Sequence, residues 1–317
     1  MGTTSIQPEL SIIIVNWNCG EVILNCLESL QQTIKKHSYE IIVIDNNSTD
    51  KSPELIEKKY PQILLIKNNF NNYFSGGNNQ GYNVSKGKNI FLLNPDIIAP
   101  EESVDRLLDF IKNNNRPAIT VKLLNLDGTI QNTMYRSFPS AFTLFATGLS
   151  KLVPVLRSLP NVNKYLSLNR DFQKDFDVEQ APGAAILMKR ELIKKLNYLL
   201  DEINFPLFYN DVDLSFRIKK LGEKILYKSD VSFYHIKQQS LDKLDFYDYS
   251  KNYCISSLKY FKKHKLYFDY LILKMAFFIR FGIIFLISLL HMIFNRISRI
   301  ELERRKNIIS KILKEEF

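Results

Sequence analysis

The sequence predicts an α/β fold, a mostly parallel sheet with flanking helices, followed by a helical C-terminal tail that is both basic and apolar. The first observation is Leu10–Val15, an almost unbroken apolar run typical of strands buried on both faces. The second is Glu21–Lys36, which places apolar residues at helical spacing on one side. Because this strand-then-helix order repeats along the first half of the chain, we expect parallel strands joined by right-handed crossovers.

The other elements follow from the same two patterns, apolar runs for strands and periodic apolar residues for helices. The predicted strands are Leu10–Val15, Glu40–Ile44, Ile63–Ile66, Asn89–Leu93, Ala118–Leu124, Ala184–Met188, Lys224–Tyr227 and Val231–Tyr234. The predicted helices are Glu21–Lys36, a short one opened by Pro53, Pro100–Asn114, Asp211–Leu221 closed by Gly222 at the C′ position, and the chain from Asp245 onward. The Gly- and Asn-rich segment Asn71–Gly81 is predicted to be a loop.

Charge and cysteine content narrow the class of protein. The chain has 317 residues and a formal net charge of +10, but residues 259–317 hold 13 of the 43 Lys and Arg and only 5 of the 33 Asp and Glu. The remainder shows no basic stripe with stacking aromatic residues, so we expect no nucleic-acid partner. Met1–Glu9 lacks the apolar core of a signal peptide, and three scattered cysteines suit a reducing compartment, which together favour a cytoplasmic location.

A carboxylate follows one predicted strand at the point where ligands bind in open α/β sheets. Asp96 comes after Asn89–Leu93 through Asn94 and Pro95, and proline cannot continue a central strand. Asp96 is therefore expected just beyond the carboxyl end of the sheet, where it could hold a divalent cation against a diphosphate. An ordinary turn aspartate is the alternative interpretation.

Other strand ends and one helix start carry further candidates. They are Asn16, Asp45 and Asn47 after the first two strands, Gly76, Gly77 and Asn79 in the predicted loop, Asp211 and Asp213 at a helix start, and His235 after the last strand. Aspartate commonly caps helices, and a lone histidine after a strand is more often structural, so these alternatives stay open. The sequence has no G-x-G-x-x-G after the first strand and no G-x-x-x-x-G-K-[ST], which disfavours dinucleotide oxidoreductases and P-loop proteins.

From Leu10 to about Ser240 the order of these segments resembles family 2 glycosyltransferases of the GT-A fold, which is Rossmann-like, and specifically their bacterial rhamnosyltransferase-like branch. The resemblance rests on the segments Ser11–Asn18, Ile44–Asp50, Phe74–Asn79, Leu93–Asp96, Pro182–Ala185, Asn210–Leu214 with Arg217, and His235. Three positions depart from the family pattern: Asn94 replaces the first acid of the D-x-D element, Asn210 replaces an acid, and Tyr73 stands where glycine is common.

The resemblance implies roles for four of the candidate residues. Asp45 would read the nucleotide base, and Asp211 would be the general base. Asp96 would be the last carboxylate of the metal-binding D-x-D element, with His235 beside the metal and the diphosphate, and the expected cofactor is Mg²⁺ or Mn²⁺. The other expected donor-binding residues are Asn16, Asn47, Gly76, Gly77, Asn79, Asn94 and Asp213.

The activity implied by the resemblance is inverting, metal-dependent transfer of a sugar from a nucleotide-sugar donor. The acceptor would be a saccharide, lipid-linked in surface polysaccharide synthesis, and dTDP-rhamnose would be the donor. UDP-galactofuranose or a UDP-hexose is the alternative donor. A catalytically silent scaffold subunit that only binds nucleotide sugar is the alternative from another class, and Asn94 and Asn210 motivate it.

The C-terminal tail suggests a membrane partner, and we divide the chain into a glycosyltransferase domain, 1–245, and a helical region, 246–317. Met275–Phe294 is apolar apart from Arg280 and His291, which is borderline for a spanning helix of about 20 residues. Arg296–Lys314 continues as a basic amphipathic helix. We expect peripheral association with the inner face of the cell membrane; packing on the domain or against a homo-oligomer partner is the alternative.

Overall fold

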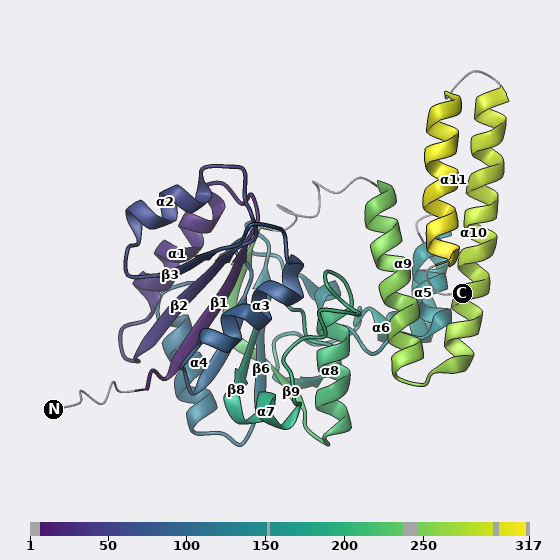
Figure 1. Ribbon diagram of the computed structural model, residues 1–317. Helices are drawn as coiled ribbons and strands as arrows, with labels where there is room; N and C mark the ends of the chain where they lie inside the picture. The colour runs from purple at the N-terminus through teal and green to yellow at the C-terminus, as the bar shows by residue number, and fades with distance from the viewer. Residues whose placement is uncertain (1–6, 151–152, 237–245, 294–297, 315–317) are drawn as a thin grey trace. The chain divides into compact units, whose positions relative to one another are not determined.

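The computed structural model describes residues 7–150, 153–236, 246–293 and 298–314. The chain forms two compact units (Figure 1). The first comprises Met1–Phe138 and Lys164–Ser240, and the second comprises Pro139–Asn163 and Leu241–Phe317. The predicted C-terminal region was a single continuous segment, whereas the structure groups residues from the middle of the chain with the last helices.

A mixed sheet forms the centre of the first unit (Figure 1). Its strands, within the described residues, are β1 Leu10–Asn16, β2 Tyr39–Asp45, β3 Leu64–Lys67, β4 Asn89–Leu93, β5 Ile97–Ile98, β6 Ala118–Leu124, β7 Phe176–Val178, β8 Ala185–Lys189 and β9 Ile225–His235. The strand order is β3-β2-β1-β4-β8-β6-β9-β5, with β7 also paired to β9. The four neighbouring strands β3, β2, β1 and β4 are parallel to one another, and β6 is parallel to β9. In contrast, β8, β5 and β7 are antiparallel to their neighbours. The predicted α/β fold with flanking helices is confirmed.

The helices of the first unit connect these strands. They are α1 Val22–Thr33, α2 Ser52–Lys59, α3 Tyr73–Val84, α4 Ser103–Lys112, the 3₁₀ turn η1 Asn132–Met134, α7 Arg190–Lys195 and α8 Asn210–Lys220. Gly222 has φ +76° after α8, and Glu223 N–H donates to Ile218 O at 3.2 Å. Gly222 therefore lies at the C′ position as predicted, and the hydrogen bonds form a Schellman motif.

The prediction of a loop at Asn71–Gly81 is wrong, because most of this segment forms α3. A Cβ added at Gly81 would lie 2.4 Å from Ile13 Cγ2, and one at Gly77 would lie 2.8 Å from Val15 Cγ2. Glycine at these positions lets α3 pack closely on one face of β1. Tertiary packing therefore outweighs the low helix propensity of glycine and asparagine.

A single bulged strand replaces the two predicted ones near the end of the first unit. The β6–β9 register runs from Val121 opposite Lys228 directly to Lys122 opposite Ser232, so β9 accommodates extra residues at this point. Ser229 is held there by Asp175, whose Oδ1 accepts from its backbone N–H at 2.8 Å and from its hydroxyl at 2.6 Å. The strand then continues to His235, which is the last residue at the carboxyl end of β9.

The second unit is helical. Its elements are α5 Ala141–Leu149, η2 Pro154–Ser158, α9 Phe246–Lys263, α10 Tyr267–Ile293 and α11 Arg299–Lys314, and α6 Pro160–Tyr165 begins in this unit. α10 packs against α5, α9 and α11, with Leu273, Phe277 and Phe281 buried on one face. By length and composition α10 could cross a membrane, since Tyr267–Leu290 spans 24 residues with a mean hydropathy of 2.2.

Candidate functional site

The carboxyl ends of β1 and β2 form the first part of the candidate site. The strands place Asn16 opposite Asp45, and both side chains are buried. Asn16 Nδ2 donates to Asp45 Oδ1 at 2.7 Å, while Ser48 donates to the same carboxylate from its hydroxyl at 2.6 Å and from its N–H at 3.1 Å. Asn47, in the turn between them, is exposed with a left-handed φ of 61°, a conformation that asparagine tolerates. These bonds fix the orientation of the Asp45 carboxylate.

The two-residue strand β5 brings Asp96 and His235 together. It pairs antiparallel with the end of β9, with Ile97 opposite His235, and the N–H of Ile236 donates to Asp96 O at 3.0 Å. His235 Nε2 lies 3.4 Å from Asp96 Oδ1 and 3.5 Å from Asn94 Nδ2. The structure therefore brings Asn94, Asp96 and His235 close together, as the resemblance implied for Asp96 and His235.

The Asp96–His235 pair fits a divalent cation. Asp96 Oδ1 is buried, and it has no hydrogen-bond partner within the part of the chain that the structure describes. A buried carboxylate oxygen is unfavourable unless a cation or a proton donor meets it. Carboxylate oxygen and imidazole nitrogen are both ligands that Mn²⁺ accepts, and Mg²⁺ accepts the first. The described residues form no group of three or more His, Cys, Asp or Glu suited to a metal, so these two groups would be only part of a coordination shell.

Asp211 supplies a carboxylate at the start of α8. Its Oδ1 accepts from the N–H of Val212 at 2.8 Å, and its Oδ2 faces the N–H of Gly183 at 3.4 Å. Burial raises the pKa of Asp211 above its usual range, although these N–H groups and the charge of Arg136 oppose the shift. A carboxylate of raised pKa is a better proton acceptor once ionised, which suits a general base.

The loop before β8 connects Asp211 to the cation pair. Asn94 N–H donates to Ala184 O at 2.9 Å, and the preceding residue, Gly183, is the one that contacts Asp211. The turn that carries Asp96 and the helix start that carries Asp211 therefore contact two consecutive loop residues. The candidate cation ligands and the candidate base thus belong to one region of the first unit.

Two predicted donor-binding residues have internal partners instead. Asp213 is fully buried and its Oδ2 accepts from Arg217 Nε at 2.8 Å. Asn79 Nδ2 donates to Leu200 O at 2.9 Å and to Glu202 Oε2 at 2.8 Å. These contacts account for both residues as anchors of the fold, and donor binding by either one stays a prediction.

Gly76 and Gly77 also have a packing explanation. They were predicted to let the backbone approach a ligand, but a Cβ at Gly76 would lie 2.4 Å from the Asn72 side chain, and Gly77 packs on Val15. Neither glycine has a positive φ. Close packing within the protein therefore explains both glycines, and their contact with a donor remains untested.

Gln131 and Arg136 are residues near the site that the sequence analysis did not identify. Gln131 is 2% exposed and contacts His235 through both atoms of its side-chain amide. The positive charge of Arg136 acts to lower the pKa of Asp211, and Arg136 Nε donates to Thr133 O at 2.8 Å. Only the pairing of β6 with β9 brings Gln131 to His235, so no local pattern could have indicated it.

Comparisons with known proteins identify the family and the fold of the chain. Residues 11–196 match the profile of "Glycosyl transferase family 2", more than half of the chain. Over 125 residues the chain is 32% identical to the poly(ribitol-phosphate) beta-glucosyltransferase of Bacillus spizizenii, covering 38% of this chain and 20% of that protein. Over 89 residues it is 39% identical to the Escherichia coli UDP-Glc:alpha-D-GlcNAc-diphosphoundecaprenol beta-1,3-glucosyltransferase WfaP, covering 27% of this chain and 35% of that protein. The chain thus matches well under two thirds of the length of these curated relatives.

A solved structure shows the same fold. The mannosyltransferase PcManGT from Pyrobaculum calidifontis, in complex with GDP-Man and Mn²⁺, superimposes with a TM-score of 0.52 and 14% identity, covering 82% of this chain and 65% of that one. The predicted GT-A-like architecture is confirmed, whereas the rhamnosyltransferase-like branch is a finer prediction that these relatives do not show. The profile match over more than half of the sequence decides the family: the chain belongs to glycosyl transferase family 2.

Proposed function

We propose that this protein is a glycosyltransferase that moves a hexose from a nucleotide sugar to a saccharide acceptor with inversion at the anomeric carbon. The observation that carries the proposal is Asp96 Oδ1, which has no hydrogen-bond partner among the described residues and lies 3.4 Å from His235 Nε2. The loop residues Gly183 and Ala184 connect this pair to the partly buried carboxylate of Asp211. Together these residues provide ligands for a cation bound to the diphosphate and a base for the acceptor hydroxyl.

The residues of the chain divide the chemistry between them. Asp96 and His235 would hold Mg²⁺ or Mn²⁺, which neutralises charge on the departing nucleotide diphosphate. Asp211 accepts the proton of the acceptor hydroxyl as its oxygen attacks, and its raised pKa makes that transfer more favourable. Asp45, held by Asn16 and Ser48, presents a fixed acceptor to the nucleotide base.

For the donor we favour a UDP-hexose over dTDP-rhamnose. The names of the two curated relatives describe glucosyltransferases, and one of them uses UDP-Glc with a diphosphoundecaprenol-linked acceptor. That relative also supports a lipid-linked saccharide as the acceptor here. UDP-galactofuranose and dTDP-rhamnose remain in the donor panel that tests the proposal.

The test is a thermal-shift panel of nucleotide sugars with and without Mn²⁺, followed by a donor-hydrolysis assay. A ligand that binds the folded state raises the melting temperature by mass action. We expect the largest shift from a UDP-hexose with Mn²⁺, and slow release of UDP in the second assay. Binding without turnover would identify a silent scaffold subunit, and the absence of any Mn²⁺-dependent shift would refute the proposed site.

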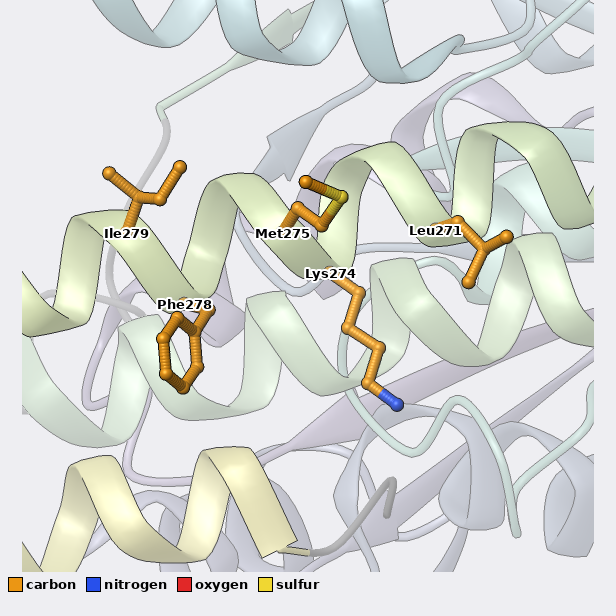
Figure 2. A pocket seen from close by; sticks show the side chains of 5 residues that line it. All are labelled: Leu271, Lys274, Met275, Phe278 and Ile279. Carbon is orange, nitrogen blue, oxygen red and sulfur yellow. The ribbon is translucent and has the colours of Figure 1, made fainter.

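We further propose that α10 binds the cytoplasmic surface of the cell membrane. Several large apolar side chains on α10 are exposed, including Leu271, Met275, Phe278 and Ile279, which line a groove together with Lys274 (Figure 2). Exposed apolar surface of this extent is typical of an interaction site. Lysine can bury its aliphatic part there while its ammonium group stays in the lipid headgroup layer.

The packing of the second unit favours α10 lying in the membrane surface rather than crossing it. α11 packs against α10 and carries exposed charges at Arg299, Arg304 and Lys306. A spanning α10 would draw these charges into hydrocarbon, which is strongly unfavourable. At the interface, the basic groups would instead attract anionic lipid headgroups.

Flotation with anionic liposomes tests this second proposal. The double variant Met275→Glu, Ile279→Glu should lose liposome binding and stay folded, because both side chains are exposed in the wild type. Ile203→Glu is the matched control, since Ile203 is an equally apolar, 82% exposed side chain of the first unit. If the full chain ignores anionic liposomes at low salt and sediments as a dimer, the apolar face is a homo-oligomer interface instead.

A further inference from the structure

The side chain of Gln131 clamps His235 from two directions. Gln131 lies between β6 and η1, where its N–H donates to Leu123 O at 2.9 Å. Its Nε2 donates to the carbonyl oxygen of His235 at 2.7 Å, and its Oε1 lies 2.9 Å from Nδ1 of the same histidine. Both residues are almost completely buried, at 2% and 5% exposure, so water does not compete for these bonds.

The orientation of the Gln131 amide follows from its neighbours. One amide atom faces two main-chain carbonyl oxygens, His235 O at 2.7 Å and Leu124 O at 3.3 Å. Carbonyl oxygens only accept hydrogen bonds, so this atom must be the nitrogen. The other amide atom is then the oxygen, which also only accepts.

This orientation decides which nitrogen of His235 carries the proton. Because Oε1 of Gln131 accepts, His235 Nδ1 must donate, and the neutral imidazole then has its lone pair on Nε2. That lone pair faces Asp96 Oδ1 at 3.4 Å, an oxygen with no hydrogen-bond partner among the described residues. Two acceptors, His235 Nε2 and Asp96 Oδ1, therefore lie close together where a cation could bind both, and Asn94 Nδ2, 3.5 Å from Nε2, is a weak donor to the same lone pair.

We propose that Gln131 is a positioning residue that holds His235 in its Nδ1–H tautomer, so that Nε2 stays available to the cation bound with Asp96. Metal-binding histidines commonly donate their second N–H to a neighbouring acceptor, which fixes the ring and strengthens the ligand. Here a neutral amide performs that task and also fixes the main chain at the end of β9. The inference rests on the proposed cation site, but the tautomer itself can be measured without metal or substrate.

The direct test is nitrogen NMR of the full-length chain labelled at its four histidines, without metal and at about pH 9, well above the pKa of free imidazole. His235 is assigned by the signal that disappears in His235→Gln. We expect the Nδ1–H pattern in the wild type. In Gln131→Met we expect the proton on Nε2, where it can donate to Asp96 Oδ1.

A titration with Mn²⁺ alone connects the tautomer to the cation. Loss of a partner behind a metal ligand typically lowers metal affinity by roughly 10- to 100-fold, and we expect that range for Gln131→Met. Gln180→Met is the matched control: Gln180 is also buried, and its Oε1 has no partner within the described residues. It should bind Mn²⁺ as the wild type does.

The results separate this inference from the proposed function. An Nε2–H tautomer in the wild type overturns the role of Gln131, whatever the variants do, even if the enzyme is active. Unchanged Mn²⁺ affinity in folded Gln131→Met overturns it as well. An Nδ1–H tautomer in a chain that turns over no donor would support Gln131 and count against the proposed activity alone.

Discussion

Asp211→Asn tests whether Asp211 acts as a base while changing the size of its side chain very little. The amide has nearly the size of the carboxylate, and its oxygen can still accept from the N–H of Val212, which lies 2.8 Å from Oδ1. The variant loses the ability to take a proton, and with it the negative charge and the long contact of Oδ2 with Gly183 N–H at 3.4 Å. General-base assistance contributes roughly 10²- to 10⁴-fold to rate, so we expect sugar transfer to fall by about that factor while donor binding persists.

The same substitution should stabilise the protein at neutral pH. The pKa of Asp211 is raised in the folded state by burial, so the unfolded chain ionises this carboxyl more readily than the folded one does. As pH rises from the ordinary aspartate value through the raised one, the group therefore reduces the free energy of unfolding. Asparagine carries no charge and removes that penalty. The gain in melting temperature should be present at pH 7 and absent below about pH 3.9, where both states are protonated.

Asp213→Asn is the matched control, one half-turn away on α8. Arg217 Nε donates to Asp213 at 2.8 Å and both side chains are buried, so the variant leaves a guanidinium group without its counter-charge. Breaking such a pair typically destabilises by about 3–5 kcal/mol. The two variants should therefore shift the melting temperature in opposite directions. If Asp211→Asn keeps more than about a tenth of wild-type turnover, or melts lower at pH 7, the assignment of Asp211 as a base of raised pKa is refuted.

The other predictions concern the cation, the packing of α3 and the pH dependence of turnover. A chelator should abolish transfer and Mn²⁺ or Mg²⁺ should restore it, while Asp96→Ala should weaken donor binding as well as turnover; full activity in excess chelator would remove Asp96 from the site. Gly81→Ala should destabilise by about 1–3 kcal/mol, measured by denaturant unfolding, because its Cβ would meet Ile13 at 2.4 Å; Gly148→Ala, with open space around its Cβ, should be neutral or stabilising. In the pH profile of kcat/KM, the midpoint of the acid limb should lie above the ordinary aspartate pKa, because the pKa of Asp211 is raised. An acid limb centred near pH 3.9 would contradict this.

Local sequence patterns were sufficient to predict the main strands and helices and the end of the sheet at which the candidate site lies. The predicted strands Leu10–Val15, Glu40–Ile44 and Asn89–Leu93 correspond to β1, β2 and β4. A strand buried on both faces has apolar side chains at nearly every position, so the sequence alone indicates it. Asn16, Asp45 and Asp96 could be placed at strand ends, since parallel strands bring their carboxyl ends to one edge. Gly222 could be placed at the end of α8 because only a residue that tolerates positive φ fits there.

Only the tertiary structure decided which of those residues meet. β5 has two residues, too few for any periodic signal, yet its pairing with β9 sets His235 beside Asp96. Gln131 reaches His235 through strands that are remote in sequence, and Arg217 on the next turn of its helix donates to the carboxylate of Asp213. α3 forms because glycines fit against Ile13 and Val15, a neighbour relation that the segment itself does not contain. Backbone periodicity is a local property, whereas pairing, burial and the proton position on a histidine depend on groups brought together by folding.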